Sequence, residues 1–476
     1  MPQTAHLTPV PVRPSFRLAI GIAAIPISVV LAVYAYTYPF VLTGDEPHYL
    51  ILADSIARDF DVDLRNNYES DAQTKEIYGP IPPHIRRHRW GWMPYHTPGL
   101  SALLAAPFAL AGVQGARLTL TLLAGLLPCA LFLWFSRSLS RRHAAWLTVG
   151  LTVSFPFSFG AAQIYPDLVA GVAVMVLLVW LLARSDDRPG HAAPWFAWAA
   201  FWLISGLLPW LNVKYAVTTV LLGLAGASVA WRSTVTRVSR AGLVTVALLA
   251  VGPLLMVEFN RWAYHSIWGG RGGDELTRSG LRALMMFLGL HLDQGQGMFV
   301  QQPLLLLGVA GLPVMWRARP KLAVWWLLLY ASLIVPNSFQ LARWGGYSPD
   351  GRFGWSAAWL WAFPLAYLAS AVYDRCGRYL VAVVSVALAY QVALASRWLR
   401  DPFLVFPMLA EDLNARDSFF PVGIRHLLPS YYLWDFKSYL TYPPNVLAML
   451  LVIALIVAGT VAAVVYHRPS HADAAV

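Results

Sequence analysis

Charged residues and cysteines are both scarce in this chain. Asp, Glu, Lys and Arg together make up 12% of its 476 residues, whereas about 25% is usual in a soluble globular protein. This shortage excludes an ordinary soluble domain. The chain has 2 cysteines, Cys129 and Cys376, and both lie inside or beside apolar segments. They therefore supply neither a disulfide framework nor a metal cluster.

Apolar segments fill most of the sequence instead. Hydrophobic residues make up 58% of the chain and the mean hydropathy is +0.54, which indicates an all-α polytopic membrane protein with about 12 transmembrane helices. The predicted spans are residues 16–42, 116–135, 144–160, 167–184, 195–211, 213–231, 241–262, 303–316, 321–336, 357–373, 378–395 and 444–466. A further segment, Thr97–Val113, is short and rich in small residues, so we expect it to be re-entrant or interfacial.

The predicted domain organisation is simple. Residues 1–15 form a tail, residues 16–466 form a single transmembrane domain, and residues 467–476 form a second tail. The first apolar segment exceeds the 7–15 residues of a signal-peptide core, and no small-x-small cleavage site follows it. We therefore expect this segment to be retained as the first span.

Basic residues gather in the short loops and predict the orientation. They are Arg13 and Arg17, then Arg137, Arg141 and Arg142, then Arg232, Arg237 and Arg240, then Arg317, Arg319 and Lys321, and then Arg375 and Arg378. With twelve spans, all these loops and both tails lie in the cytoplasm. The net charge of +11 then reflects these loops and sites for anionic lipid, and we expect no nucleic-acid partner.

The long loops all fall on the opposite, outer side in this topology. They are residues 43–115, 263–302, 337–356 and 396–443, and they contain most of the unusual polar residues. Chemistry concentrated on one membrane face indicates a substrate that is delivered at that face. The first outer loop is predicted to contain interfacial helices.

An acidic pair directly follows the first span, in the sequence Gly44-Asp45-Glu46-Pro47-His48-Tyr49. Glycine frees the backbone, and proline suits the first position of a helix. One interpretation is a helix cap, because acids are favoured at a helix N-terminus. The other is a catalytic base, held at headgroup depth because the next helix, Pro47–Asp59, lies in the interface plane. The nearby His48 and the cations of the same loop favour the second interpretation.

An acidic run follows that helix. The residues Asp59-Phe-Asp61-Val-Asp63 resemble the start of a calcium-binding loop. However, the sixth position is Leu64 rather than glycine and the twelfth is Ser70 rather than glutamate, so a solvated turn is the better prediction.

The cationic part of the first loop reads His84-Ile-Arg86-Arg87-His88-Arg89-Trp90-Gly-Trp92. Its two histidines are four residues apart, a spacing that would put them on one face if this segment were a helix. Because no HExxH pattern is present, the signal for a metal site at these histidines is weak. We expect no cofactor, and a divalent metal is an alternative for which no residue cluster argues. Arginines beside tryptophans on the outer face suit a phosphate headgroup with an apolar tail, and nonspecific contact with anionic lipid is the alternative.

Other outer-edge residues are candidates for the same cavity. Lys214 divides two apolar segments and would be costly there unless it is paired or binds an anion. Arg271 lies in the glycine-rich run 269–273, and Arg343 and Arg352 lie in a glycine-rich turn between adjacent spans. The predicted donor-phosphate ligands are Arg352, Lys214, Arg343, Arg271 and Arg87. The predicted pocket residues are His48, His96, Tyr165 and Asp167.

With these residues the chain resembles the polytopic C-type (GT-C) glycosyltransferases. An Asp-Glu pair in the first outer loop is the hallmark of this superfamily, which includes protein O-mannosyltransferases and the lipid A aminoarabinose transferase. The resemblance extends to Thr97-Pro-Gly99, Tyr165-Pro-Asp167 and the run 345–352. Aminoarabinose transferases carry a Lys-Pro before the next apolar segment, where this chain has His96-Thr-Pro98.

The resemblance implies an inverting transfer of a hexosyl or pentosyl group from a polyprenyl-phosphate donor. The acceptor would be a hydroxyl of a glycan, a lipid or a protein, and the site would face the periplasm or exterior of a bacterial inner membrane. Asp45 would be the base, and Glu46 would orient either the acceptor or Asp45. The alternatives are a transporter or flippase of lipid-linked sugars, and a structural assembly partner.

Overall fold

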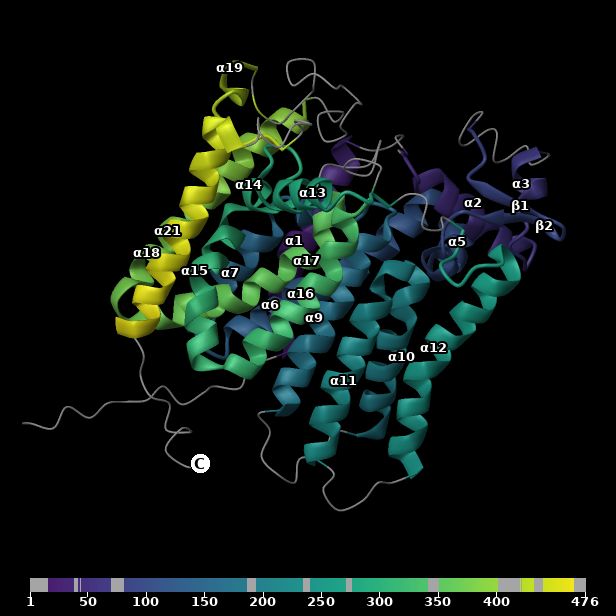
Figure 1. The fold of residues 1–476 in the computed structure, drawn as a ribbon, viewed down its shortest axis with the longest axis horizontal. Coiled ribbons are helices and arrows are strands. Elements are labelled where there is room, and N and C mark those ends of the chain that lie inside the picture. The colour runs from purple at the N-terminus through teal and green to yellow at the C-terminus, as the bar shows by residue number, and fades with distance from the viewer. Residues whose placement is uncertain are drawn as a thin grey trace, which may run out of the picture.

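Helices form almost all of the regular structure in the computed structural model (Figure 1). The structure describes residues 16–37, 42, 44–69, 81–185, 194–233, 240–270, 276–340, 351–400, 420, 422–431 and 440–465. Its longer helices are α1 (Phe16–Thr37), α5 (Gly99–Ala124), α9 (Pro166–Ser185), α10 (Trp195–Leu211), α11 (Ala216–Ser233), α12 (Arg240–Tyr264), α15 (Pro303–Ala318), α16 (Pro320–Ser338), α18 (Ala362–Trp398) and α21 (Pro443–Val465).

Shorter elements connect these helices. They are α2 (Glu46–Arg58), α3 (Arg65–Glu69), α6 (Leu126–Phe135), α7 (Arg141–Thr152), α8 (Phe157–Gly160), α13 (Gly280–Leu292), α14 (Met298–Gln301), α17 (Trp355–Ala358) and α19 (Val422–Arg425), the 3₁₀ turns η1 (Val213–Tyr215), η3 (Arg352–Gly354) and η4 (Trp359–Trp361), and the strands β1 (Ile85–His88) and β2 (Gly91–Pro94).

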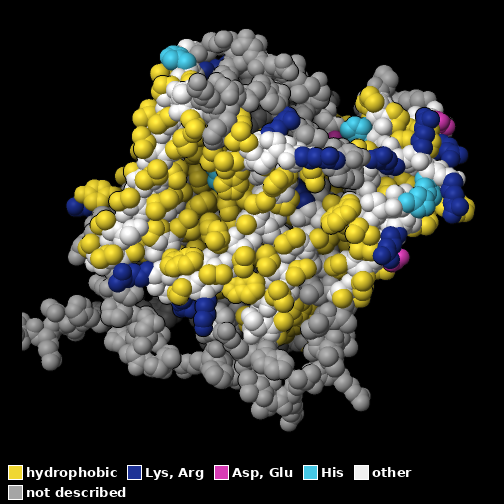
Figure 2. Space-filling model, in the orientation of Figure 1, with side chains coloured by type: hydrophobic (Ala, Val, Ile, Leu, Met, Phe, Trp, Pro, Cys, Tyr) yellow, Lys and Arg dark blue, Asp and Glu magenta, His cyan; other side chains and the backbone are white. Residues whose placement is uncertain are grey.

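The polytopic all-α class is confirmed. Among the described residues, 8 helices are long and apolar enough to cross a membrane, and α10, α13 and α15 are shorter apolar helices. Hydrophobic side chains cover the flank of the helices, as an apolar environment requires (Figure 2). The chain is therefore an integral membrane protein, and the count of twelve spans stays a prediction.

Helix α18 turns back on itself. Near its start, Pro364 packs against Gly311 of α15, and near its end the Gln391 side chain donates to the Gln301 carbonyl at 2.5 Å. A straight helix would separate Pro364 from Gln391 by roughly 40 Å, but Gln301 and Gly311 are only about 15 Å apart along the chain. The two halves are thus antiparallel, as expected for the separate predicted segments 357–373 and 378–395.

Helix α5 is interrupted where the sequence analysis places the end of the short segment Thr97–Val113. Ala111 and Gly112 have non-helical dihedral angles, and Gly112 has φ of +58°. The half before this kink packs against α2, with the Ser101 hydroxyl donating to the Tyr49 carbonyl at 2.8 Å. The half after the kink leads into α6. The re-entrant or interfacial placement of the first half stays a prediction.

The first outer loop contains the predicted helix but also a β-hairpin. Helix α2 starts at Glu46, and its residues 46–55 are all buried, so its apolar run contacts protein. Ile85–His88 pairs with Gly91–Pro94 as antiparallel strands, so His84 and His88 do not share a helix face. Gly91 adopts φ of +153°, and a Cβ there would lie 2.3 Å from the Asp63 carboxylate. Only glycine fits this close approach.

The predicted loop 263–302 contains helices that the sequence analysis did not identify. Ser279 caps α13, and its hydroxyl accepts the Arg282 N–H at 3.3 Å. Helix α13, helix α14, helix α2 and the hairpin lie toward the same end of the helices (Figure 1). Lysine, arginine and histidine side chains gather over the hairpin (Figure 2).

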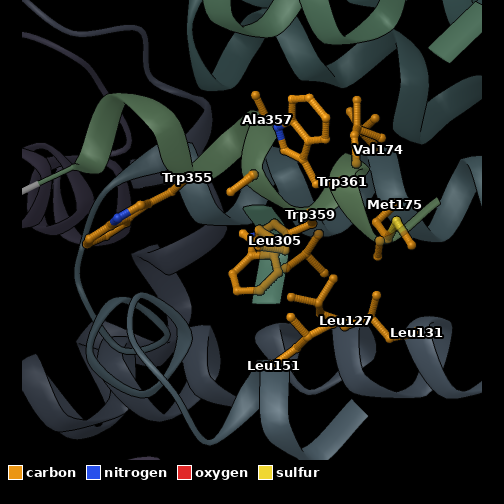
Figure 3. Packing of buried hydrophobic residues seen from close by; sticks show 14 of the residues in the cluster. Leu127, Leu131, Leu151, Val174, Met175, Leu305, Trp355, Ala357, Trp359 and Trp361 are labelled. Atoms are coloured by element: carbon orange, nitrogen blue, oxygen red, sulfur yellow. The ribbon is translucent and has the colours of Figure 1, made fainter. Parts of the chain in front are cut away.

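The core lies where α17 and η4 meet α6, α9 and α15. Trp355 and Trp359 are each 1% exposed. Leu127 and Leu305 lie in the cluster around Trp359, whereas the Trp355 ring lies apart from them and against Gly160 of α8 (Figure 3). Gly171 of α9 allows this approach, since a Cβ there would lie 2.9 Å from the Trp355 carbonyl oxygen. Arg352 lies in η3, which directly precedes α17, so the core anchors one side of the site.

Candidate active site

Asp45 is positioned by the start of α2, but its carboxylate does not cap the helix. Gly44 adopts φ of +55°, which suits glycine, and α2 begins at Glu46 with no side-chain cap bond from Asp45. The Asp45 carbonyl accepts the N–H groups of His48 and Tyr49 at 3.1 and 3.2 Å. The carboxylate is thus directed to other partners, which disfavours the simple helix-cap interpretation.

Three cationic or imidazole groups surround that carboxylate. Arg352 Nη1 lies 3.5 Å from Asp45 Oδ2. His84 Nδ1 and His96 Nε2 lie 3.5 and 3.6 Å from Asp45 Oδ1. The Asp45 side chain is 16% exposed and that of Arg352 is 5% exposed, so the pair is largely shielded from water while one edge of the carboxylate stays accessible.

A second carboxylate, Asp167 at the start of α9, holds the other cation. Lys214 Nζ lies 2.5 Å from Asp167 Oδ1 and donates to Asn337 Oδ1 at 2.9 Å. The Tyr215 hydroxyl also donates to Asp167 Oδ1, at 3.0 Å. Arg352 Nε lies 3.8 Å from Asp167 Oδ2, so Arg352 bridges both acids. The expectation that a buried Lys214 needs a partner is confirmed.

These four charged side chains line one cavity of about 460 Å³. His96 and Asn337 also line it, and Trp268 and Phe353 contribute apolar walls. The volume lies within the range of small-molecule sites, which commonly combine apolar walls with a few convergent polar groups. The structure therefore brings together Asp45, His96, Asp167, Lys214 and Arg352, all of which the sequence analysis singled out.

Glu46 and Tyr165 support this cavity without lining it. Glu46 is 1% exposed, and its Oε1 accepts the Ile164 N–H at 2.8 Å. The Tyr165 hydroxyl accepts the Asp45 N–H at 3.2 Å, and its ring lies 4.1 Å from the Arg352 guanidinium carbon. Both residues position the loop before α9 against the start of α2, so Glu46 can act on Asp45 through that loop.

His48 lies behind the cavity in a histidine stack. Its ring stacks on His84 with centroids 3.7 Å apart, and its Nδ1 lies 2.7 Å from the Tyr68 hydroxyl. Burial and the neighbouring His84 and His96 lower the pKa of His48 to about 3. His48 is therefore neutral at physiological pH, and its ring supports that of His84.

The remaining predicted phosphate ligands are not brought to the cavity. Arg87 is exposed on β1, its guanidinium lies 5.2 Å from the Trp92 ring, and it is absent from the cavity lining. Its position does not support phosphate binding in this cavity. Arg271 and Arg343 lie outside the described residues.

Two contributors had weaker sequence signals. His84 is separated from Asp45 by most of the first loop. It directly precedes the first strand of the hairpin, and the position of the hairpin brings its ring close to the Asp45 carboxylate. Asn337 is a polar residue near the end of the apolar helix α16, where its amide also donates to the Phe353 carbonyl at 2.8 Å. A polar side chain in an apolar span is the signal that would have identified it.

An apolar cavity of about 670 Å³ lies among α5, α9, α10 and α12. Leu103, Leu207 and Leu255 are among its lining residues, and Gly99 and Leu211 bring it close along the chain to His96 and Lys214. The molecule thus offers a polar cavity and an apolar cavity, and α9 contributes residues to both.

Gly351→Ala should destabilise the protein by about 1–2 kcal/mol, because Gly351 has φ of +76° and an L-residue is strained there. A Cβ would also lie 2.5 Å from the Gln301 amide, in the turn that presents Arg352. Thermal unfolding of the purified protein would measure the loss. Gly280→Ala is the matched control, since its Cβ would meet nothing within 4 Å. Equal stability of both variants would contradict the prediction.

No protein-family model and no curated protein matches the chain. Solved structures match the chain in fold. ArnT from Cupriavidus metallidurans bound to undecaprenyl phosphate has a TM-score of 0.50 and 15% identity, covering 95% of this chain and 75% of that chain. The apo structure of ArnT has the same TM-score and identity, covering 94% and 76%. The chain therefore has the polytopic membrane fold of ArnT.

Proposed function

We propose that the protein is a membrane glycosyltransferase that moves a sugar from a polyprenyl-phosphate donor to an acceptor hydroxyl. The observation that carries the proposal is the shared cavity, in which the Asp45 carboxylate lies 3.5 Å from Arg352 and which Lys214 also lines. The fold adds support, because a protein of this fold, ArnT, has been crystallised with undecaprenyl phosphate.

The donor's phosphate would bind Arg352 and Lys214. Both cations line the cavity and both are largely buried, with side chains 5% and 9% exposed. Their charge acts strongly in such a shielded place. The polyprenyl chain would occupy the apolar cavity among α5, α9, α10 and α12, which has the lining that an isoprenoid requires.

Asp45 would act as the base. The acceptor oxygen attacks the anomeric carbon, the bond from that carbon to the phosphate oxygen breaks, and the hydroxyl proton passes to the Asp45 carboxylate. The leaving phosphate keeps the bonding electron pair and needs a cation rather than an acid, a role for Arg352. Attack from the face opposite the phosphate inverts the anomeric centre.

Release of the lipid phosphate tests the proposal. Purified protein in proteoliposomes would receive undecaprenyl phosphate carrying a labelled sugar, together with envelope lipids and glycans as acceptors. We expect labelled acceptor and one undecaprenyl phosphate released for each sugar transferred. A flippase would instead move the intact donor between leaflets, so quantitative recovery of uncleaved donor would overturn the proposal.

Donor binding can be tested separately from transfer. Lys214→Met should weaken undecaprenyl phosphate binding in native mass spectrometry by about tenfold or more, because a charge-assisted contact contributes roughly 1.5–3 kcal/mol. Lys321→Met, at an exposed lysine in the first turn of α16, is the control. Equal loss in both variants would indicate nonspecific charge attraction instead of a phosphate site.

A further inference from the structure

Three potential metal ligands converge at one wall of the polar cavity. Among the described residues, one carboxylate oxygen of Asp45 and one ring nitrogen each of His84 and His96 all lie within 4.8 Å of one another. Asp45 precedes α2, His84 precedes β1, and His96 precedes α5. The fold thus brings three separate chain segments to a single point.

The separations fit a bridging cation better than direct hydrogen bonds. The ring nitrogens of His84 and His96 lie 3.5 and 3.6 Å from Asp45 Oδ1, beyond the 2.7–3.2 Å of a normal N–H···O bond. Two ligand atoms bound to a tetrahedral zinc ion at about 2.0–2.2 Å are about 3.3–3.6 Å from each other. Small side-chain adjustments would therefore bring the three atoms into coordination.

The surroundings hold these ligands in place. His48 stacks on the His84 ring with centroids 3.7 Å apart, and the Tyr49 ring lies 4.6 Å from that of His96. Arg352 contacts the other carboxylate oxygen of Asp45, Oδ2, at 3.5 Å. Such outer contacts are typical of metal sites, where they orient the ligands and tune their basicity.

The charge balance of the cavity gives an independent reason. The charges of Arg352 and Lys214 are offset by those of Asp45 and Asp167, which lie 2.5 to 3.8 Å from them. The formal charges of these four side chains therefore sum to zero, and a phosphate bound by Arg352 and Lys214 would share these cations with the two carboxylates. A divalent cation held by Asp45 and two neutral imidazoles would make this wall of the cavity positive.

We propose that Asp45 Oδ1, His84 Nδ1 and His96 Nε2 form a three-ligand site for a divalent cation of the zinc class. Three protein ligands leave a fourth position for an exogenous oxygen. Because Asp45 and His96 line the cavity, that position would be accessible from it. The identity of this exogenous oxygen rests on the proposed function: in glycosyl transfer it would belong to the acceptor or to the donor phosphate.

Zinc binding tests this directly and needs no transfer reaction. The full-length protein, purified without a histidine tag and stripped with a chelator, would be titrated with Zn²⁺ alone and its metal content measured. We expect one tightly bound zinc per chain. His84→Ala and His96→Ala should each weaken binding by about 100-fold or more, because even outer-shell partners contribute 10–100-fold.

His88→Ala is the control and the main challenge. His88 Nε2 lies 2.7 Å from His265 Nε2 on the exposed hairpin, so this pair is the alternative zinc site. Loss of zinc in His88→Ala with retention in His84→Ala would overturn the proposal, as would absence of tight zinc from the wild-type protein.

Two further measurements separate folding from binding. Zinc should raise the unfolding temperature of the wild type and leave those of folded His84→Ala and His96→Ala unchanged. Substitution with Co²⁺ should give the visible absorption of a tetrahedral site, which an octahedral surface site lacks. If zinc binds as predicted but no sugar is transferred, the proposed function fails and the metal site stands.

Discussion

Asp45→Asn should lower the rate of sugar transfer by about 10²–10⁴-fold, the usual contribution of a general base. The substitution keeps the size of the side chain and removes its basicity. The main-chain bonds of Asp45 to His48, Tyr49 and Tyr165 do not use the carboxylate, so α2 should still form. Transfer from a polyprenyl-phosphate donor would be measured on protein that elutes as a single folded species.

Asp59→Asn is the matched control for this experiment. Asp59 follows α2, is exposed, and bonds Asn66 at 3.0 Å, so its amide variant should transfer at the wild-type rate. Glu46→Gln should give an intermediate loss, because glutamine keeps an oxygen for the Ile164 N–H. Full transfer by folded Asp45→Asn would rule out Asp45 as the base.

Arg352→Ala should both destabilise the protein and nearly abolish transfer. Removing one partner of a buried ion pair typically costs about 3–5 kcal/mol, and the Arg352 side chain is 5% exposed between two carboxylates. We expect about 3 kcal/mol, because Lys214 still compensates Asp167. Transfer should fall by about 10²–10³-fold, as for loss of one donor to a developing oxyanion. Denaturation and activity of the folded fraction would measure the two effects.

A double-mutant cycle separates the roles of Arg352. Adding Asp45→Asn to Arg352→Ala should recover about 1–3 kcal/mol, because the uncompensated carboxylate is removed. The exposed pair Arg261–Glu258, 3.0 Å apart with side chains 60% and 67% exposed, is the matched cycle. Its coupling should stay below about 1 kcal/mol. Equal couplings for the two pairs would contradict a buried network around Asp45.

Local signals predicted part of the site well. Glycine, two acids and proline indicated a helix start at residues 44–47, and α2 does begin at Glu46 after a left-handed Gly44. Apolar runs and basic loops likewise separated the two halves of α18. Each of these features depends on residues that are neighbours along the chain, so composition and spacing were sufficient.

Other features needed contacts between distant segments. The run His84–Trp92 becomes a hairpin because Asp63 accepts the Trp92 N–H at 2.7 Å and the Leu64 N–H donates to the Trp92 carbonyl at 3.0 Å. Arg87 was expected to bind phosphate, but the strand places it away from the cavity. Helix α13 was missed because it is short and lies within a predicted loop.

By itself, the sequence determined that the protein is a polytopic membrane protein, which residues begin α2, and which charged residues stand out against an apolar background. These properties follow from hydrophobicity and local backbone preferences. The tertiary structure decided which of those charges meet. In it, Arg352 contacts both Asp45 and Asp167, and Lys214 contacts Asp167. His84 also lies close to Asp45. Electrostatic interactions and metal coordination depend on distances of a few ångströms between residues far apart in the chain, and folding alone sets those distances.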